Sequence, residues 1–191
     1  MSKEKIYELK ITLLDSKPSI WRKIHVSSDS LLPDLHNIIQ TSMGWTNSHL
    51  HQFIDKGTFY AAPDPWGEMD NKDYQKIQID HILKKEKDKT LYEYDFGDGW
   101  RHEILLEKIL EKGENEKYPV CVDGKNACPP EDCGGIWGYM DMKEIMRNPK
   151  HKEYEEMKEW LGGELNPKAF DKNEVNEMLQ SEDYGVITFF D

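Results

Sequence analysis

TLYEYDFGDGWRHEILLEKIL, residues 90–110, is the stretch that decides the fold. Asp-Gly lies here between two runs rich in aromatic and β-branched residues, which is the strongest local signal for a β-hairpin. The sequence therefore predicts strands over 90–96 and 101–110, joined by a turn at 97–99. Because side chains alternate along a strand, one face of the first strand is expected to carry its aromatic residues Tyr92, Tyr94 and Phe96.

The segments before this hairpin predict further strands and one long helix. Apolar and polar residues alternate over 7–13, and the run 20–26 follows a turn, so these segments predict another hairpin. Apolar residues then recur at helical spacing over 35–43, with a proline near the first turn and Gly44 just past the end. We also expect short strands over 50–54 and 58–61, a loop over 62–76 and a short helix over 79–83.

Beyond the central loop at 121–139 the pattern changes to helices, expected over 140–147, 154–161 and 174–179. The segment 186–190 is apolar enough to pair as an edge strand or to pack on the body of the protein. We expect an α+β protein, with a mostly antiparallel sheet packed on one main helix in a β-grasp-like arrangement and a C-terminal helical tail. Residues 1–118 would form the sheet core, and 119–191 a rigid loop and a helical tail, packed together as a single compact unit.

The segment CVDGKNACPPEDCGGIWGY, residues 121–139, is predicted to be an irregular but rigid loop. Proline fixes φ and glycine permits positive φ, so Pro129-Pro130 and Gly134-Gly135 specify one path that no ordinary helix or strand could follow. Such loops commonly carry function. We expect this loop to lie over the tip of the 90–110 hairpin.

Composition limits the classes of partner. The chain has 25 Lys and Arg and 37 Asp and Glu, for a net charge of −12, which disfavours nucleic acid and anionic membranes. No window approaches the roughly 20 apolar residues of a membrane span, and the first residues lack the apolar segment of a signal peptide. We expect a cytoplasmic protein whose partner is a protein or a small ligand.

Several motifs, in one order along residues 6–180, resemble the plasmid pRiA4b ORF-3-like family. They are WRKI at 21–24, MGW at 43–45, HLHQF at 49–53, YEYDFGDGWRH at 92–102, ACPPEDCGGIWGY at 127–139 and WLGGELNPKAFDKNEVN at 160–176. The resemblance implies a compact α+β domain of unassigned activity, also known as an insertion-element accessory protein labelled a resolvase. Serine recombination needs an activated serine among arginines and a basic DNA-binding module, and the sequence offers neither.

Polar residues in three of these segments predict a ligand site. If His49 lies in the same strand as His51, both imidazoles project from one face and could converge on one ion or substrate. The predicted ligands of a divalent metal ion are His49, His51, Asp98, His102 and Glu131. These residues could instead have ordinary structural roles. An H-x-H pair on a strand is commonly exposed or hydrogen-bonded within the fold, aspartate is frequent in turns, and acidic side chains cap backbone amides.

The predicted binding site adds aromatic, acidic and glycine residues near the loop. Tryptophan and tyrosine anchor binding surfaces, although they could equally fill the gap between the sheet and the helical tail. Paired glycines before a helix offer amides to an anion, or simply form a tight turn. Besides the five metal candidates, the predicted binding residues are Trp66, Asp95, Trp100, Arg101, Asp132, Gly134, Gly135, Trp137 and Tyr139.

The three cysteines do not follow a standard metal pattern. Cys121, Cys128 and Cys133 lack the paired C-x-x-C spacing of zinc ribbons, and a structural zinc would need a fourth ligand from elsewhere. Reduced cysteines that pack as small apolar side chains are the favoured interpretation.

Three hypotheses about function follow. The favoured one is a binding module with an acidic, aromatic-rimmed groove for a protein or a small ligand. The first alternative is a metal-dependent hydrolase that uses the His/Asp/Glu cluster. The second is an accessory protein of a mobile element that acts on nucleic acid, which the net charge opposes.

Overall fold

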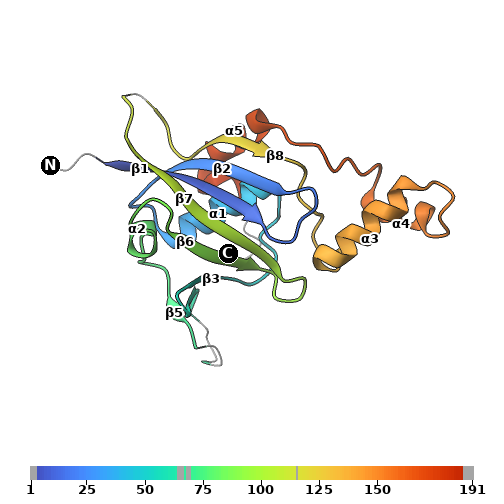
Figure 1. The fold of residues 1–191 in the computed structure, drawn as a ribbon, viewed down its shortest axis with the longest axis horizontal. Helices are drawn as coiled ribbons and strands as arrows, with labels where there is room; N and C mark the ends of the chain where they lie inside the picture. The colour runs from blue at the N-terminus through green and yellow to red at the C-terminus, as the bar shows by residue number, and fades with distance from the viewer. Residues whose placement is uncertain (1–3, 64–66, 68–69, 115, 187–191) are drawn as a thin grey trace.

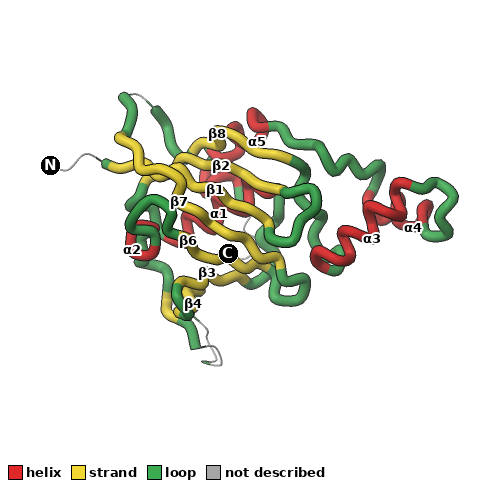
Figure 2. The backbone as a smooth tube through the Cα atoms, viewed as in Figure 1, coloured by secondary structure: helices red, strands yellow, loops and turns green. Residues whose placement is uncertain are grey.

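The computed structural model describes residues 4–63, 67, 70–114 and 116–186 (Figure 1). Within them, eight strands form one sheet in the order β5-β4-β3-β6-β7-β1-β2-β8. Figure 2 shows this sheet as a continuous twisted layer. Neighbouring strands are antiparallel except β4 and β5, which are parallel, so the sheet is mixed. The strands are β1 Lys5–Leu13, β2 Ile20–Ser27, β3 His51–Asp55, β4 Thr58–Ala61, β5 Lys72–Asp73, β6 Lys89–Tyr94, β7 Trp100–Glu111 and β8 Val120–Lys125.

Helices cover one face of the sheet and extend from one end of it. The helix α1 crosses one face, and α5 packs against both α1 and β8 (Figure 1). The helices α3 and α4 pack on each other and project beyond the sheet (Figure 1). The bounds are α1 Leu32–Met43, α2 Ile79–Ile82, α3 Gly135–Arg147, α4 Tyr154–Leu161 and α5 Lys172–Leu179, followed by the 3₁₀ turn η1 Glu182–Gly185.

The predicted α+β class is confirmed, whereas the arrangement around a single main helix and the β-grasp-like topology are not. The sheet is wider than expected, because β5 and β8 add an edge strand on each side. No helix among the described residues is long and apolar enough to cross a membrane.

The core lies between the sheet and α1. Along β1, Leu9 and Ile11 are completely buried on the face that meets the helix, as the alternating pattern predicted. On α1, Leu35, Ile38 and Ile39 are also completely buried. Burying one such side chain stabilises a fold by about 1.5–3 kcal/mol, so each of these residues helps to hold the helix on the sheet.

Two predictions about local structure were wrong. The strand β6 ends at Tyr94, and Asp95 then adopts a left-handed conformation with φ 56°, so Phe96 lies in the turn with 41% of its surface exposed. The segment 121–139 is irregular only over 126–134, because β8 occupies its start and α3 its end. The expected edge strand at 186–190 lies outside the described residues except for Val186.

Candidate functional site

The loop between β8 and α3, residues 126–134, is bound to two other parts of the fold. Nε1 of Trp45 donates a hydrogen bond to the carbonyl oxygen of Pro129 at 3.0 Å. One carboxylate oxygen of Glu131 accepts from the backbone N–H of Thr46 at 2.9 Å and from its hydroxyl at 2.7 Å. The other accepts from the hydroxyl of Tyr94 at 2.5 Å. The β8–α3 loop is therefore fixed to the end of β6 and to residues 44–50, the α1–β3 connection.

The start of α3 packs on the turn between β6 and β7. Gly135 has φ 66°, and a Cβ atom there would lie 2.4 Å from the carbonyl oxygen of Asp98. Only a residue without a side chain permits this approach. The end of the loop thus contacts the tip of the hairpin, as the sequence predicted.

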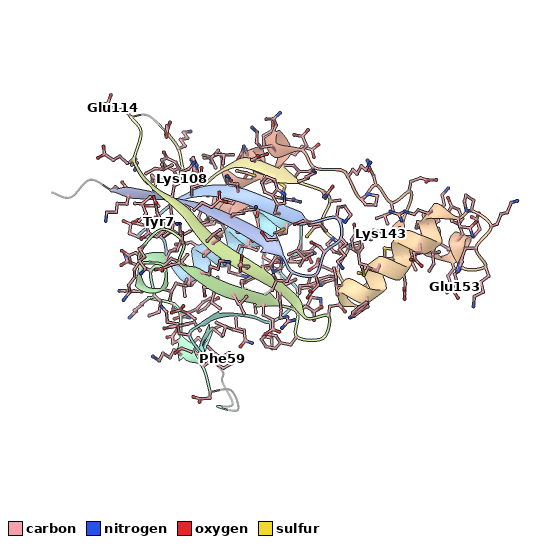
Figure 3. All side chains as sticks on the ribbon, in the orientation of Figure 1. Tyr7, Phe59, Lys108, Glu114, Lys143 and Glu153 are labelled. Carbon is pink, nitrogen blue, oxygen red and sulfur yellow. The ribbon has the colours of Figure 1, made fainter. Side chains whose placement is uncertain are left out.

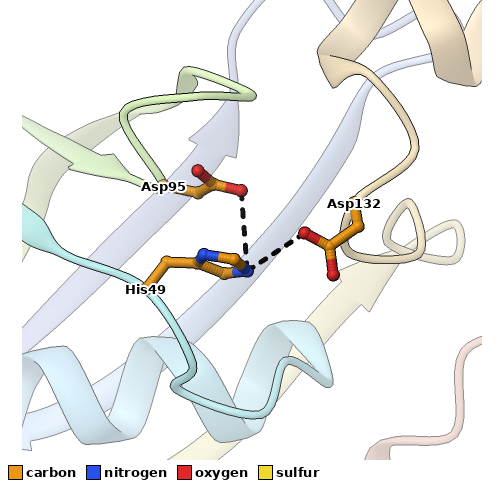
Figure 4. A group of neighbouring side chains, drawn as sticks. All are labelled: His49, Asp95 and Asp132. Atoms are coloured by element: carbon orange, nitrogen blue, oxygen red, sulfur yellow. Dashed lines mark ion pairs between the residues drawn. The ribbon is translucent and has the colours of Figure 1, made fainter.

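Three side chains capable of binding a metal converge where these segments meet (Figure 4). They are His49 from the α1–β3 connection, Asp95 just after β6, and Asp132 from the β8–α3 loop. Their potential ligand atoms all lie within 4.8 Å of one another. Nε2 of His49 lies 3.3 Å from Oδ1 of Asp132 and 3.7 Å from Oδ2 of Asp95.

The backbone around Asp95 fixes the direction of its carboxylate. Its backbone N–H donates to the carbonyl of Leu50 at 2.8 Å, and its own carbonyl accepts from Gly99 at 2.6 Å. Oδ1 accepts from the backbone N–H groups of Gly97 at 2.9 Å and Asp98 at 3.3 Å. This hydrogen bonding at the turn leaves Oδ2 directed at His49. Asp132 also has positive φ, at 59°, a left-handed conformation that aspartate adopts more readily than most residues.

A buried polar network holds the α1–β3 connection that carries His49. Nε2 of His36 donates to the side-chain oxygen of Asn47 at 2.7 Å, so its Nδ1 accepts from the hydroxyl of Tyr92 at 2.8 Å. Gln40 donates to the same hydroxyl at 2.9 Å and accepts from the backbone N–H of Asn47 at 3.0 Å. Burial lowers the pKa of His36 to about 4, so this imidazole is neutral at pH 7.

Of the five residues predicted to bind a metal, the structure places only His49 in the converging group. The ring of His51 stacks on that of His36, with centroids 3.4 Å apart, and its Nε2 is 2.8 Å from the hydroxyl of Tyr74. Glu131 is occupied by the hydrogen bonds to Thr46 and Tyr94. Asp98 lies at the hairpin turn, where its Oδ2 is buried without a hydrogen-bond partner in the described structure.

His102 is completely buried, with its ring 5.2 Å from Trp45 and 5.5 Å from Tyr92. Neither ring nitrogen makes a hydrogen bond of ordinary geometry with the described residues. Burial lowers the pKa of this imidazole to about 3, although the nearby carbonyls of Tyr92 and Trp100 oppose the shift. His102 is therefore a neutral part of the core.

The other predicted binding residues divide between core and surface. Trp100 and Tyr139 are buried, Gly134 precedes α3 with φ 85°, and Arg101 is exposed at 4.0 Å from Asp15. Trp137 is 76% exposed, and Trp66 lies outside the described residues. The cysteines are free thiols, and burial raises their pKa values to about 11 for Cys121 and about 12 for Cys128 and Cys133.

A pocket of about 290 Å³ adjoins the converging group, because Asp132 also lines it. Its other walls come from α3, α4 and the residues just before them: Cys133, Met142, Glu153, Glu156, Met157 and Trp160. Trp160 of α4 is 51% exposed. In the sequence, the acidic residues of the segment 153–159 are the feature from which this wall of the pocket could have been predicted.

The model of the family described as Plasmid pRiA4b ORF-3-like protein matches residues 5–174. The chain belongs to this family. The uncharacterized protein y4hQ of Sinorhizobium fredii (strain NBRC 101917 / NGR234) is 35% identical over 159 residues, which cover 82% of this chain and 81% of that protein.

Family resemblance extends to a solved structure, the crystal structure of the protein of unknown function MM3350 from Methanosarcina mazei Go1. It shares 37% sequence identity, with a TM-score of 0.81, over 90% of this chain and 98% of that chain. The names of both relatives, an uncharacterized protein and a protein of unknown function, assign no activity to the site.

The contact between the loop and the hairpin predicts a difference between two glycine substitutions. Gly135→Ala places a Cβ against the carbonyl of Asp98, whereas Gly162→Ala, at a similar φ of 68°, meets nothing within 4 Å. Left-handed alanine costs roughly 1–2 kcal/mol, so Gly162→Ala should lose about that much and Gly135→Ala clearly more. Urea denaturation measures both free energies of unfolding, and equal losses would contradict the close packing.

Buried His102 predicts a pH dependence of stability. The unfolded chain takes up this proton near pH 6.5 and the folded chain only near pH 3, so stability falls as pH decreases between these values. His102→Phe removes the titrating ring without removing a hydrogen bond of ordinary geometry. We expect the loss of unfolding free energy between pH 7 and pH 4 to be smaller in the variant by about 3 kcal/mol. An unchanged loss would show that His102 does not titrate as a buried base.

Proposed function

We propose that this protein binds a divalent metal ion at His49, Asp95 and Asp132. The observation that carries the proposal is the position of Nε2 of His49, a buried atom without a hydrogen bond in the described structure, between two carboxylate oxygens at 3.3 and 3.7 Å. Two ligands bound to one ion at about 2.1 Å in tetrahedral geometry lie about 3.4 Å apart. The spacing of the three side chains therefore suits an ion placed between them.

A direct ion pair explains these distances less well. A protonated imidazole would donate Nε2–H to one carboxylate at about 2.7–2.9 Å, yet both separations from His49 exceed that length. A metal ion instead engages the nitrogen and both carboxylates at once. This interpretation also accounts for two acidic side chains that converge within 4.8 Å although, among the described residues, no lysine or arginine forms an ion pair with either.

The donor set favours transition metals. One imidazole nitrogen and two carboxylate oxygens suit zinc, manganese or iron better than calcium or magnesium, which bind mainly oxygen. Three protein ligands leave at least one coordination position for water or for a ligand. Asp132 is 70% exposed at its side chain, so the open position would face solvent.

The ion would make the site a metal-dependent binding site, and hydrolysis is the reaction class that it could support. A divalent ion lowers the pKa of a bound water toward 7, which supplies a nucleophile at neutral pH. The protein would hold the ion through His49 and Asp95, and Asp132 would close the site from the loop. The hydrolase hypothesis therefore rests on a ligand set different from the one predicted from the sequence.

A second candidate function is recognition of a cationic ligand in the pocket between α3 and α4. Three of its lining residues, Asp132, Glu153 and Glu156, are acidic, and Trp160 presents a half-exposed indole. Glu153 has Lys152 as a partner at 3.0 Å, in an exposed pair that contributes little. Carboxylates and an indole face together suit the ammonium or guanidinium group of a basic peptide. This pocket supports the favoured hypothesis of an acidic, aromatic-rimmed groove.

Metal binding is tested with protein purified without chelator. We expect about one equivalent of zinc or manganese per chain by elemental analysis and equilibrium dialysis. His49→Ala and Asp95→Asn should each weaken the affinity by roughly 100-fold or more, since even changes behind the ligands cost 10–100-fold. His81→Ala, at an exposed histidine of α2, is the matched control and should bind like the wild type. If the His49 variant bound as tightly as this control, the proposal would fail.

The cationic-ligand hypothesis is tested by comparing two exposed tryptophans. Trp160 lines the α3–α4 pocket, whereas Trp137 is more exposed and does not. Loss of an exposed cation–π contact should weaken binding roughly two- to fivefold. We expect this loss in Trp160→Ala, and not in Trp137→Ala, when a lysine- and arginine-rich peptide is titrated by calorimetry. Equal effects, or no binding by the wild type, would contradict the hypothesis.

A further inference from the structure

A second pocket, of about 390 Å³, lies on a neighbouring face of α3 and differs in charge from the rest of the protein. Lys143 and Arg147 line it from α3, and Lys168 lines it from the segment before α5. Met146, Leu165 and Asn166 also contribute to its walls, and no carboxylate does. The chain as a whole carries a net charge of −12, whereas among the described residues the only charged ones that line this pocket are cations. The local electrostatic potential is therefore opposite in sign to that expected from the net charge.

The cations of this pocket have no carboxylate partner. Among the ion pairs of the described residues, none includes Lys143, Arg147 or Lys168, although other lysines of the same region pair with glutamates. Lys143 and Arg147 are four residues apart on one helix, where like charges destabilise each other. An anion in the pocket would remove this repulsion.

Lys143 lines the pocket as a largely buried side chain that is held in place. Only 6% of its surface is exposed, its Nζ donates to the carbonyl of Lys17 at 2.7 Å, and the same atom lies 4.5 Å above the ring of Tyr139. Burial and the neighbouring Arg147 lower the pKa of Lys143. Figure 3 shows Lys143 on α3, while Glu153 lies at the outer end of the α3–α4 pair. The acidic and the cationic pockets thus use different parts of this helical pair.

The opposite wall is an ordered turn. The carbonyl of Pro167 accepts from the backbone N–H of Ala127 at 3.0 Å, which ties the turn to the β8–α3 loop. The side-chain oxygen of Asn166 accepts a hydrogen bond from the backbone N–H of Lys168 at 3.2 Å. This bond does not use the NH₂ group of the same side chain. This wall of the pocket is therefore held in place by hydrogen bonds to the β8–α3 loop and within the turn.

We propose that this pocket binds a small organic phosphate. Lys143, Arg147 and Lys168 would hold the phosphate group. The guanidinium of Arg147 can donate to two phosphate oxygens at once. A phosphate dianion also neutralises more of the positive charge of these three residues than a carboxylate would. Met146 and Leu165 would contact the organic part. The volume is in the range of small-molecule sites, about 300–1,000 Å³, and exceeds what inorganic phosphate alone needs.

A free organic phosphate fits better than the backbone of a nucleic acid. A long polyanion would bring many charges toward a protein of net charge −12, and such binding depends on extended basic surfaces. A mononucleotide or a sugar phosphate brings one phosphate group to one pocket. The proposal does not rest on the metal site, because none of the three metal-group residues lines this pocket.

Isothermal titration calorimetry of the full chain tests the proposal with four probes: adenosine monophosphate, glucose 6-phosphate, inorganic phosphate and adenosine. We expect at least one of the two phosphate monoesters to bind more tightly than inorganic phosphate, and adenosine not to bind. Arg147→Ser and Lys168→Ala remove exposed side chains, so both variants should fold, and each should weaken monoester binding roughly tenfold or more. Lys150→Ala, an exposed lysine outside the pocket, is the charge-matched control and should leave binding unchanged.

Three results would overturn the proposal. They are binding of both monoesters that is absent at millimolar concentration or no tighter than that of inorganic phosphate, equal binding of adenosine and its monophosphate, and equal losses in Arg147→Ser and Lys150→Ala. A single-stranded oligonucleotide that bound much more tightly than the monoesters would instead indicate a nucleic-acid backbone as the ligand. His49→Ala should retain monoester binding, so failure of the metal proposal and failure of this one can be told apart.

Discussion

The hydrogen bonds accepted by Glu131 are the interaction on which the candidate site depends. One carboxylate accepts from the hydroxyl of Tyr94 and from the backbone and side chain of Thr46, and so joins the β8–α3 loop to a strand end and to the α1–β3 connection. Hydrogen bonds to a charged group contribute about 1.5–3 kcal/mol each. Burial and the carboxylate itself raise the pKa of Tyr94, so its hydroxyl remains a donor at neutral pH.

The position of Glu131 determines where the next residues of the loop lie. Asp132 follows immediately and reaches His49, and Gly135 then packs on the hairpin turn as α3 begins. The loop thereby contributes to the metal group, to the acidic pocket and, through Ala127, to the turn that lines the cationic pocket. An irregular segment of the backbone can specify three sites in this way only because it is fixed at several points.

Much of the fold could be predicted because its signals are local. Alternation in β1, the helical spacing in α1 and Asp-Gly between β6 and β7 each depend on neighbouring residues. The strand β8 was missed, since VCVDGK contains a glycine and polar residues and forms a strand through pairing with β2. Strand propensity depends on the neighbouring strand, so such a strand cannot be predicted from the sequence of the segment alone.

The candidate site was harder to predict because it depends on where elements end. The expectation that His49 and His51 share a face assumed that both lie in a strand, but β3 begins at His51. His51 therefore turns toward His36, while His49 lies before the strand and points toward Asp95 and Asp132. Both aspartates were expected in the same polar site as His49, but not among the metal ligands, because their approach is set by a turn and a loop from distant parts of the chain.

The most direct test of this account is a crystal structure of the protein equilibrated with zinc or manganese, with the ion located by anomalous scattering. The account predicts an anomalous peak about 2.1 Å from Nε2 of His49 and at similar distances from one oxygen each of Asp95 and Asp132. A peak only at other residues, or no peak at an otherwise unchanged loop, would contradict the account.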